Sequence, residues 1–170
     1  MGVSGGTLTT VNSGTGNQQR ATIMGNLLVS GGEVTIDEGK QVGHHFGDLI
    51  VDGNITWIDG VFRPWVDGTV SSTFCDSWNC TNTFTILAAG RGWGINGFAT
   101  GAGAKLGPAG VLNNQANLAG RTWDIMYASN GIRLQQGSPA LSFETHAEAD
   151  DWVIAETQDH KTWKIQRTQN

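Results

Sequence analysis

Glycine is the feature that most limits how this chain can fold. The chain has 170 residues, and its 25 glycines interrupt nearly every stretch of a dozen residues before position 138. A glycine inside a helix costs about 1 kcal/mol relative to alanine, so long helices are excluded from most of the chain. Short β-branched runs that end in Asp-Gly or Gly-Gly recur instead, and these are strand and turn signals. The sequence therefore predicts a soluble, all-β domain.

Composition excludes several classes of protein. The 7 Trp and 6 Phe residues argue against a disordered, low-complexity chain. No apolar run approaches the roughly 18 residues that a transmembrane helix needs, so we expect no transmembrane segment. The net charge of −5 argues against a nucleic acid as a partner. No motif for a cofactor stands out, and none is expected.

Two segments of the chain look like copies of one another. Gly25–Gly31 aligns with Gly47–Gly53 at an offset of 22 residues, and the similarity continues from Val34–Asp37 to Ile55–Asp59. A repeat near 20 residues in which each copy holds short strands predicts a solenoid, most simply a parallel β-helix. An antiparallel β-sandwich is the alternative, since its strands also follow one another at short spacing.

A β-helix stacks the side chains at alternate strand positions into an apolar interior. The offset of the two copies places Leu27 over Leu49 and Val29 over Val51. We therefore expect both pairs to be stacked and buried.

The chain divides into two parts near residue 138. Residues 1–137 are expected to form the solenoid domain, with residues 69–82 as an inserted loop that breaks the strand pattern. Residues 138–170 contain no Gly and carry nine charges. This tail is predicted to hold a short helix within 144–151, followed by a hairpin.

The hairpin is predicted from two strand-like runs, 152–155 and 162–165. A solenoid that ends without a cap exposes unpaired strand edges, which need covering. The tail is therefore a candidate C-terminal cap or a candidate assembly segment between subunits. In both arrangements Trp152 and Trp163 should be buried.

The two cysteines lie close together in the sequence. Cys75 and Cys80 are separated by four residues, which can close a small ring. We expect a disulfide between them and hence an oxidising compartment, with two free thiols as the alternative. A structural zinc site needs four ligands. The His44-His45 pair is interpreted as a solvated turn, and no metal site is expected.

The middle of the chain resembles a known family. The segments that carry the resemblance are Phe84–Gly90, Gly97-Phe98, Trp123–Tyr127 and Asn130–Leu134, preceded by Gly47–Phe62. They resemble the closing part of bacterial secreted and surface β-helix proteins, a group that includes autotransporter passenger domains and large repeat proteins. The resemblance implies a right-handed parallel β-helix that is exported to the extracellular space or the cell surface.

Two features depart from the pattern of that family. Its members usually continue into a membrane barrel or an anchor, whereas only 36 residues follow Leu134 here. Their coils are also usually far more numerous. We expect the chain to be either a piece of a larger protein or a small self-contained relative.

The sequence contains no catalytic signature, and the protein is not expected to be an enzyme. The leading hypothesis is a structural module: a rigid β-helical stalk for display or adhesion, or a self-associating segment. The first alternative is a glycan-binding module that uses exposed Trp65 and Trp78 side by side. The second is a β-helix enzyme that degrades polysaccharides, which needs a groove with converging carboxylates. The adjacent residues Asp150 and Asp151 would face opposite sides of a strand.

Overall fold

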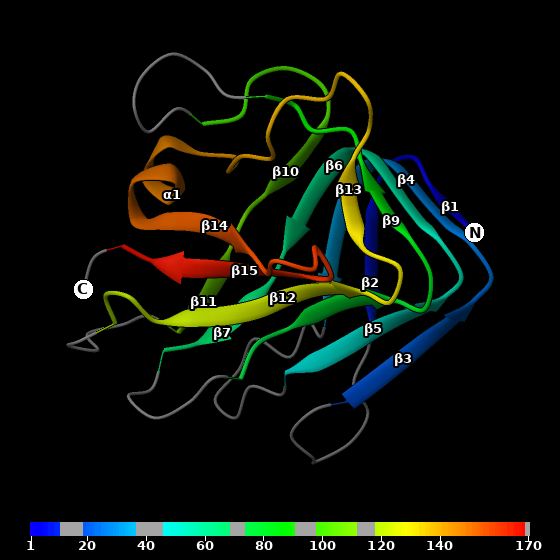
Figure 1. Ribbon diagram of the computed structural model, residues 1–170, viewed down its shortest axis with the longest axis horizontal. Coiled ribbons are helices and arrows are strands. Elements are labelled where there is room, and N and C mark those ends of the chain that lie inside the picture. Colours follow the sequence, from blue (N-terminus) through cyan, green and yellow to red (C-terminus); the bar gives the residue numbers. More distant parts are fainter. Residues whose placement is uncertain (11–18, 37–45, 69–73, 91–97, 112–117, 169–170) are drawn as a thin grey trace.

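The protein is mostly β, with one short helix. The computed structural model describes residues 1–10, 19–36, 46–68, 74–90, 98–111 and 118–168. Its strands form two main sheets and a two-stranded ribbon (Figure 1). Within these described residues, no helix is long and apolar enough to cross a membrane.

The first sheet consists of parallel strands only. Its order is β1 (Gly2–Val3), β4 (Leu27–Ile36), β6 (Ile55–Arg63), β9 (Phe84–Ile86) and β13 (Ile132–Leu134). Two further strands extend it: β2 (Thr7–Thr10) pairs with β4, and β10 (Ala104–Leu106) pairs with β6.

The second sheet is mixed. Its order is β14 (Trp152–Glu156), β15 (Thr162–Arg167), β12 (Thr122–Ala128), β8 (Ser77–Cys80), β5 (Gly47–Asp52) and β3 (Gln19–Met24). The pairs among β3, β5, β8 and β12 are parallel, whereas β15 runs antiparallel to both β12 and β14. The separate ribbon pairs β7 (Trp65–Asp67) with β11 (Ala109–Val111).

The prediction of a right-handed parallel β-helix is wrong. The antiparallel pairing of β15 makes the second sheet mixed, and the described strands form no closed helical coil. The expected inserted loop 69–82 also contains a strand, because β8 lies inside the second sheet between β5 and β12. Residues 69–73 of that segment lie outside the described residues.

The predicted stacking of the two copies is wrong as well. Leu27 and Val29 belong to β4 of the first sheet, whereas Leu49 and Val51 belong to β5 of the second. All four side chains are buried, as expected, with exposed fractions of 0 to 1%. The copies look alike because both are strands with one buried face, and such strands share their alternation whether or not they are neighbours.

The strand pairs β3–β5, β4–β6, β5–β8 and β6–β9 are 28 to 29 residues apart rather than 22. Asn26 and Asn54, which precede β4 and β6, are 28 residues apart, and the Asn26 side-chain oxygen accepts hydrogen bonds from the Asn54 backbone N–H at 2.9 Å and from its side chain at 3.2 Å. The Asn54 side chain accepts in turn from the backbone N–H of Thr83, 29 residues later, at 3.3 Å. Asn130 donates to Asn82 in the same manner at 2.6 Å. Asparagine side chains thus align successive strands of the first sheet at their start.

An aromatic cluster joins the two sheets. Trp78 on β8 packs against Trp57 on β6 at 5.4 Å, against Phe62 at 5.3 Å and against Phe84 on β9 at 4.8 Å between ring centroids. All four rings are fully buried. Tilted and edge-to-face arrangements of this kind contribute about 0.5–1.5 kcal/mol per pair beyond the burial of area. The core therefore depends on one ring of the second sheet inserted among three of the first.

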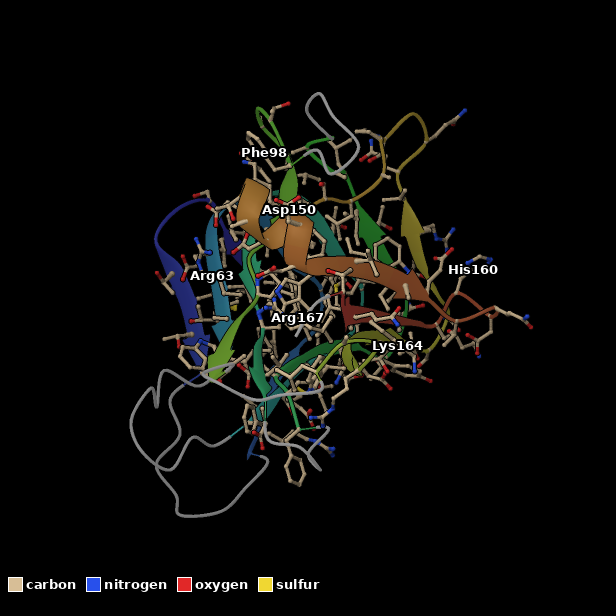
Figure 2. All side chains as sticks on the ribbon, turned by 90° about the vertical axis from the view of Figure 1, so that its left-hand side faces the viewer. Arg63, Phe98, Asp150, His160, Lys164 and Arg167 are labelled. Carbon is tan, nitrogen blue, oxygen red and sulfur yellow. The ribbon has the colours of Figure 1, made fainter. Side chains whose placement is uncertain are left out.

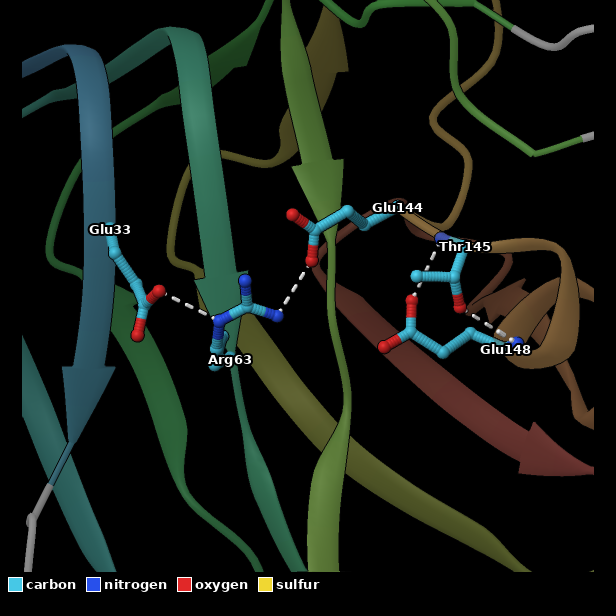
Figure 3. A network of polar contacts seen from close by, with 5 residues as sticks. All are labelled: Glu33, Arg63, Glu144, Thr145 and Glu148. Atoms are coloured by element: carbon cyan, nitrogen blue, oxygen red, sulfur yellow. Dashed lines mark hydrogen bonds and ion pairs between the residues drawn. The ribbon is translucent and has the colours of Figure 1, made fainter.

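The tail forms the predicted helix and hairpin. Helix α1 (His146–Asp151) starts with a capping box, in which Thr145 Oγ1 accepts from the Glu148 N–H at 3.2 Å and Glu148 accepts from the Thr145 N–H at 3.0 Å (Figure 3). The hairpin β14–β15 then lies beside β12, with α1 next to β14 (Figure 1). This part of the sequence prediction is confirmed.

An arginine links the tail to the first sheet. Arg63 on β6 forms ion pairs with Glu33 on β4 at 2.8 Å and with Glu144 at 2.7 Å (Figure 3). Burial disfavours its charge, but the hydrogen bonds to Glu144 and Glu33 outweigh this effect and raise the pKa of Arg63. The segment before α1 is thereby attached to the sheet by one half-buried, charge-assisted contact, while the second ion pair joins β6 to β4.

Gly60 is expected to be intolerant of a side chain because it packs against the neighbouring strand. Its φ of +96° already disfavours an alanine, and a Cβ would lie 2.7 Å from the carbonyl oxygen of Gly32. Gly25 has a similar φ of +90° but open space around its Cβ position, so Gly25→Ala is the matched control. In urea unfolding, Gly60→Ala should lower the free energy of unfolding by about 1–3 kcal/mol more than Gly25→Ala does. Equal losses of unfolding free energy in the two variants would show that Gly60 on β6 does not lie against Gly32 on β4.

Candidate functional site

The predicted Cys75–Cys80 disulfide is wrong: both thiols are free. Residues 77–80 form β8, and the chain that leads into it from Cys75 is extended. At the rise of a strand, five residue steps span about 16 Å, whereas a disulfide needs Cα atoms about 4.4–6.8 Å apart. Cys80 instead lies in the core, in register with Val51 and Ala128.

Cys75 lies in an acidic, largely buried setting. Its thiol donates to the backbone oxygen of Asp124 at 3.1 Å. Burial raises the pKa of this thiol far above its usual value, and the charges of Asp76, Asp124 and Asp48 raise it further. A nucleophilic cysteine needs a lowered pKa, so this thiol is unsuited to nucleophilic catalysis.

A buried carboxylate organises the same region. Asp76 is 1% exposed, and its oxygens accept hydrogen bonds from the N–H of Gly47 at 3.1 Å and from the N–H of Trp65 at 3.0 Å. Gly47 begins β5 and Trp65 begins β7. Because charge-assisted bonds to a buried carboxylate are strong, Asp76 holds the starts of these two strands together next to Cys75.

A polar pocket of about 440 Å³ opens beside Cys75. It is lined by Asp48, Phe74, Cys75, Ser77, Thr122, Asp124 and Lys164. Ser77 donates to Asp48 at 2.5 Å, and Lys164 on β15 forms an ion pair with Asp124 on β12 at 3.0 Å. Figure 2 shows Lys164 on the hairpin. The pocket therefore offers both hydrogen-bond acceptors and donors.

The tryptophans proposed for glycan binding do not lie side by side at the surface. Trp78 is fully buried in the aromatic cluster, so neither of its faces is open to a ligand. Trp65 is half-buried at the start of β7. The sequence suggested exposure because Trp65 follows Pro64 and Trp78 lies inside the expected loop 69–82, but β8 carries Trp78 on its inward face.

Trp152 and Trp163 are buried, with exposed fractions of 3% and 6%, as expected. The Trp152 ring packs edge-on against Trp123 at 5.5 Å and under the Arg167 guanidinium at 5.1 Å. Arg167 also forms an ion pair with Asp151 at 2.8 Å, which gives that carboxylate a structural partner. An apolar pocket of about 460 Å³ lies between the hairpin and the segment 140–143. Whether the hairpin acts as a cap or as an assembly joint stays a prediction.

The inward-facing side chains of the edge strand β3 are more exposed to solvent than those of the neighbouring strand β5. Ala21 and Ile23 on β3 and Leu8 on β2 are only partly buried, although they pack against the core. Leu49 and Val51, the partners of Ala21 and Ile23 on β5, are 1% and 0% exposed. Among the described strands, none pairs with the outer edge of β3. We call β3 with these half-buried residues the open edge.

Sequence reasoning missed Asp48, Asp76 and Asp124 as a group. Each stands alone in the sequence, and the three come together only because β5, β8 and β12 are neighbours. Within the described part of the chain, no group of three or more His, Cys, Asp or Glu side chains could hold a metal ion. His44 and His45 lie outside the described residues.

Comparison with known proteins identifies no relative: no family model, no curated protein and no solved structure matches the chain. Function must therefore be inferred from the geometry of the chain itself.

Both thiols should be present and slow to react in the native protein. Burial raises the pKa of Cys75 and of Cys80, so few thiolates form at neutral pH. A thiol-reactive dye should label two groups in denaturant without reductant and react much more slowly in buffer. The intact mass should be the same before and after reduction. A gain of two hydrogens on reduction, with no thiols in the untreated denatured sample, would contradict the structure.

Proposed function

We propose that this chain is a non-enzymatic structural module that associates with a second copy of itself through the open edge. The observation that carries the proposal is the unpaired outer side of β3 among the described strands, together with the incompletely buried core beneath it. An unpaired strand edge is a ready template for the addition of another strand.

The open edge lacks most of the devices that normally protect a sheet from association. Natural edge strands carry lysine, proline, bulges or inward-pointing charges. The sequence of β3 is Gln-Arg-Ala-Thr-Ile-Met, with Arg20 as its one charged residue, and its six residues pair with β5 without a register shift. Met24 at the end of the strand is 76% exposed. These properties favour strand pairing with a partner.

The hydrogen-bonding pattern identifies the groups that a partner would meet. The Gly25 N–H donates to the Asp52 oxygen on β5 at 3.0 Å. In a parallel pair, successive residues direct their backbone groups to alternate sides. The amides of Thr22 and Met24 are therefore directed away from β5, toward the open side.

The other edge of the second sheet argues for a closed dimer rather than a fibre. There the hairpin β14–β15 pairs with β12, and α1 lies next to β14. A head-to-tail array would need a free edge of matching parallel strands at both sides. A two-fold contact uses the same patch from both copies and closes on itself. In such a dimer, β3 would run antiparallel to β3 of the second copy.

Export to the extracellular space or the cell surface belongs to the same proposal. It rests on the resemblance of residues 25–134 to bacterial surface proteins. A display or adhesion role would use the dimer as a rigid support.

The variant Thr22→Pro tests the association. Proline removes the outward amide of Thr22 but none of the bonds to β5, so it should block strand pairing and leave the fold intact. Thr22→Val keeps the amide and is the matched control. Light scattering over a concentration series should give dimers for the natural chain and for Thr22→Val, and monomers for Thr22→Pro.

A second variant guards against misfolding. Thr22→Lys keeps the amide but places a charge on the edge, and it should also weaken the dimer. Circular dichroism and thermal unfolding of dilute samples should be nearly the same for all four proteins. A natural chain that stays monomeric at every concentration, or dimers that survive both Thr22→Pro and Thr22→Lys, would overturn the proposal.

A further inference from the structure

We propose that the polar pocket beside Cys75 binds a neutral saccharide. This site does not include the tryptophans considered from the sequence or the outer side of β3, although Arg20 of β3 forms an ion pair with its Asp48. It combines an exposed aromatic ring with carboxylates, hydroxyls and an ammonium group around one cavity. Sugars present an apolar C–H face and a rim of hydroxyl groups, and a ring beside polar groups complements both.

Phe74 provides the aromatic surface. Its side chain is 41% exposed, and its ring is stacked on Phe46 with centroids 6.4 Å apart and planes inclined by 15°. Phe46 is buried, with 7% exposed. Because the Phe74 ring lines the pocket and is stacked on a buried ring, its position is fixed before binding, and little conformational freedom is lost when a ligand binds.

The charged residues that line the pocket are two carboxylates and one ammonium group. Asp48 lies 3.5 Å from Arg20 and accepts from Ser77, while Asp124 is paired with Lys164. Each carboxylate therefore has a cationic neighbour, and the lining carries no excess of positive charge. Carboxylate oxygens accept from sugar hydroxyls, and lysine and hydroxyl side chains donate to them. Because the lining has no excess of positive charge, it favours a neutral ligand over an anionic one.

The strand that carries Asp124 is irregular directly after this residue. The pairing of β12 with β15 shifts register between Asp124 and Met126, which marks a β-bulge. Bulges redirect side chains and are frequent next to functional sites. Asp76, at the same time, fixes the starts of β5 and β7 close to Cys75. The walls of the pocket are therefore held by the fold rather than formed by the ligand.

The size of the pocket sets the size of the ligand. A volume of about 440 Å³ lies within the range of small-molecule sites. It accommodates one or two sugar rings. A divalent cation is a poorer match, because the Lys164 ammonium lies against Asp124.

The test is a titration of the isotope-labelled full chain followed by NMR. The probes are cellobiose, maltose, lactose and N,N′-diacetylchitobiose, with glucuronic acid as an anionic comparison. At least one neutral disaccharide should give saturable shifts at the amides of Phe74, Ser77 and Asp124. Glucuronic acid should bind more weakly.

Variants at the pocket separate binding from folding. Phe74→Ala and Asp124→Asn should each raise the dissociation constant about tenfold, whereas Phe74→Trp should preserve binding. Tyr127→Ala is the control, because Tyr127 is 42% exposed on the same strand outside the pocket lining. Spectra of the free variants report whether each has folded. The absence of saturable shifts with every probe, or shifts that persist unchanged in folded Phe74→Ala, would overturn the proposal.

Discussion

Trp78 inserts between three aromatic rings of the opposite sheet, and the relative placement of the two sheets depends on this contact. Its ring centroid lies 4.8 Å from that of Phe84 and 5.4 Å from that of Trp57. A buried Trp or Phe contributes about 3–5 kcal/mol, a large share of the stability of a domain. Because β8 carries this ring inward, its outward residue Ser77 lines the polar pocket together with Phe74 and Cys75, which precede the strand. The core and the candidate ligand site are therefore two faces of one strand.

The two proposed functional regions follow from the same sheet. β3 and the hairpin lie at opposite edges of the second sheet, and the polar pocket lies across β5, β8, β12 and β15 between them. A dimer that forms through the outer side of β3 would not cover the pocket, because most of its lining residues lie on strands between β3 and the hairpin. A dimer could thus present two saccharide sites on one rigid support, which is consistent with a display or adhesion role.

Local features were predictable from the sequence, and the pairing of distant strands was not. Alternation identified Leu27, Val29, Leu49 and Val51 as buried, and the Gly-free tail gave its helix and hairpin. The 22-residue offset led to the wrong stacking prediction because it aligned β4 with β5, which lie in different sheets. A better signal lay in the Gly-Asn pairs that precede β4 and β6 at a spacing of 28 residues. The disulfide prediction was wrong because part of the apparent loop is the strand β8. Asp48 and Asp124 could not be grouped from the sequence, because only the pairing of distant strands brings them together.

The register of the strands is tested most directly by NOE contacts in the labelled chain. The account predicts contacts between Leu27 and Ile55, between Leu49 and Trp78, and between the indole rings of Trp57 and Trp78. Contacts between Leu27 and Leu49 as adjacent strand partners, without those between Trp57 and Trp78, would contradict it.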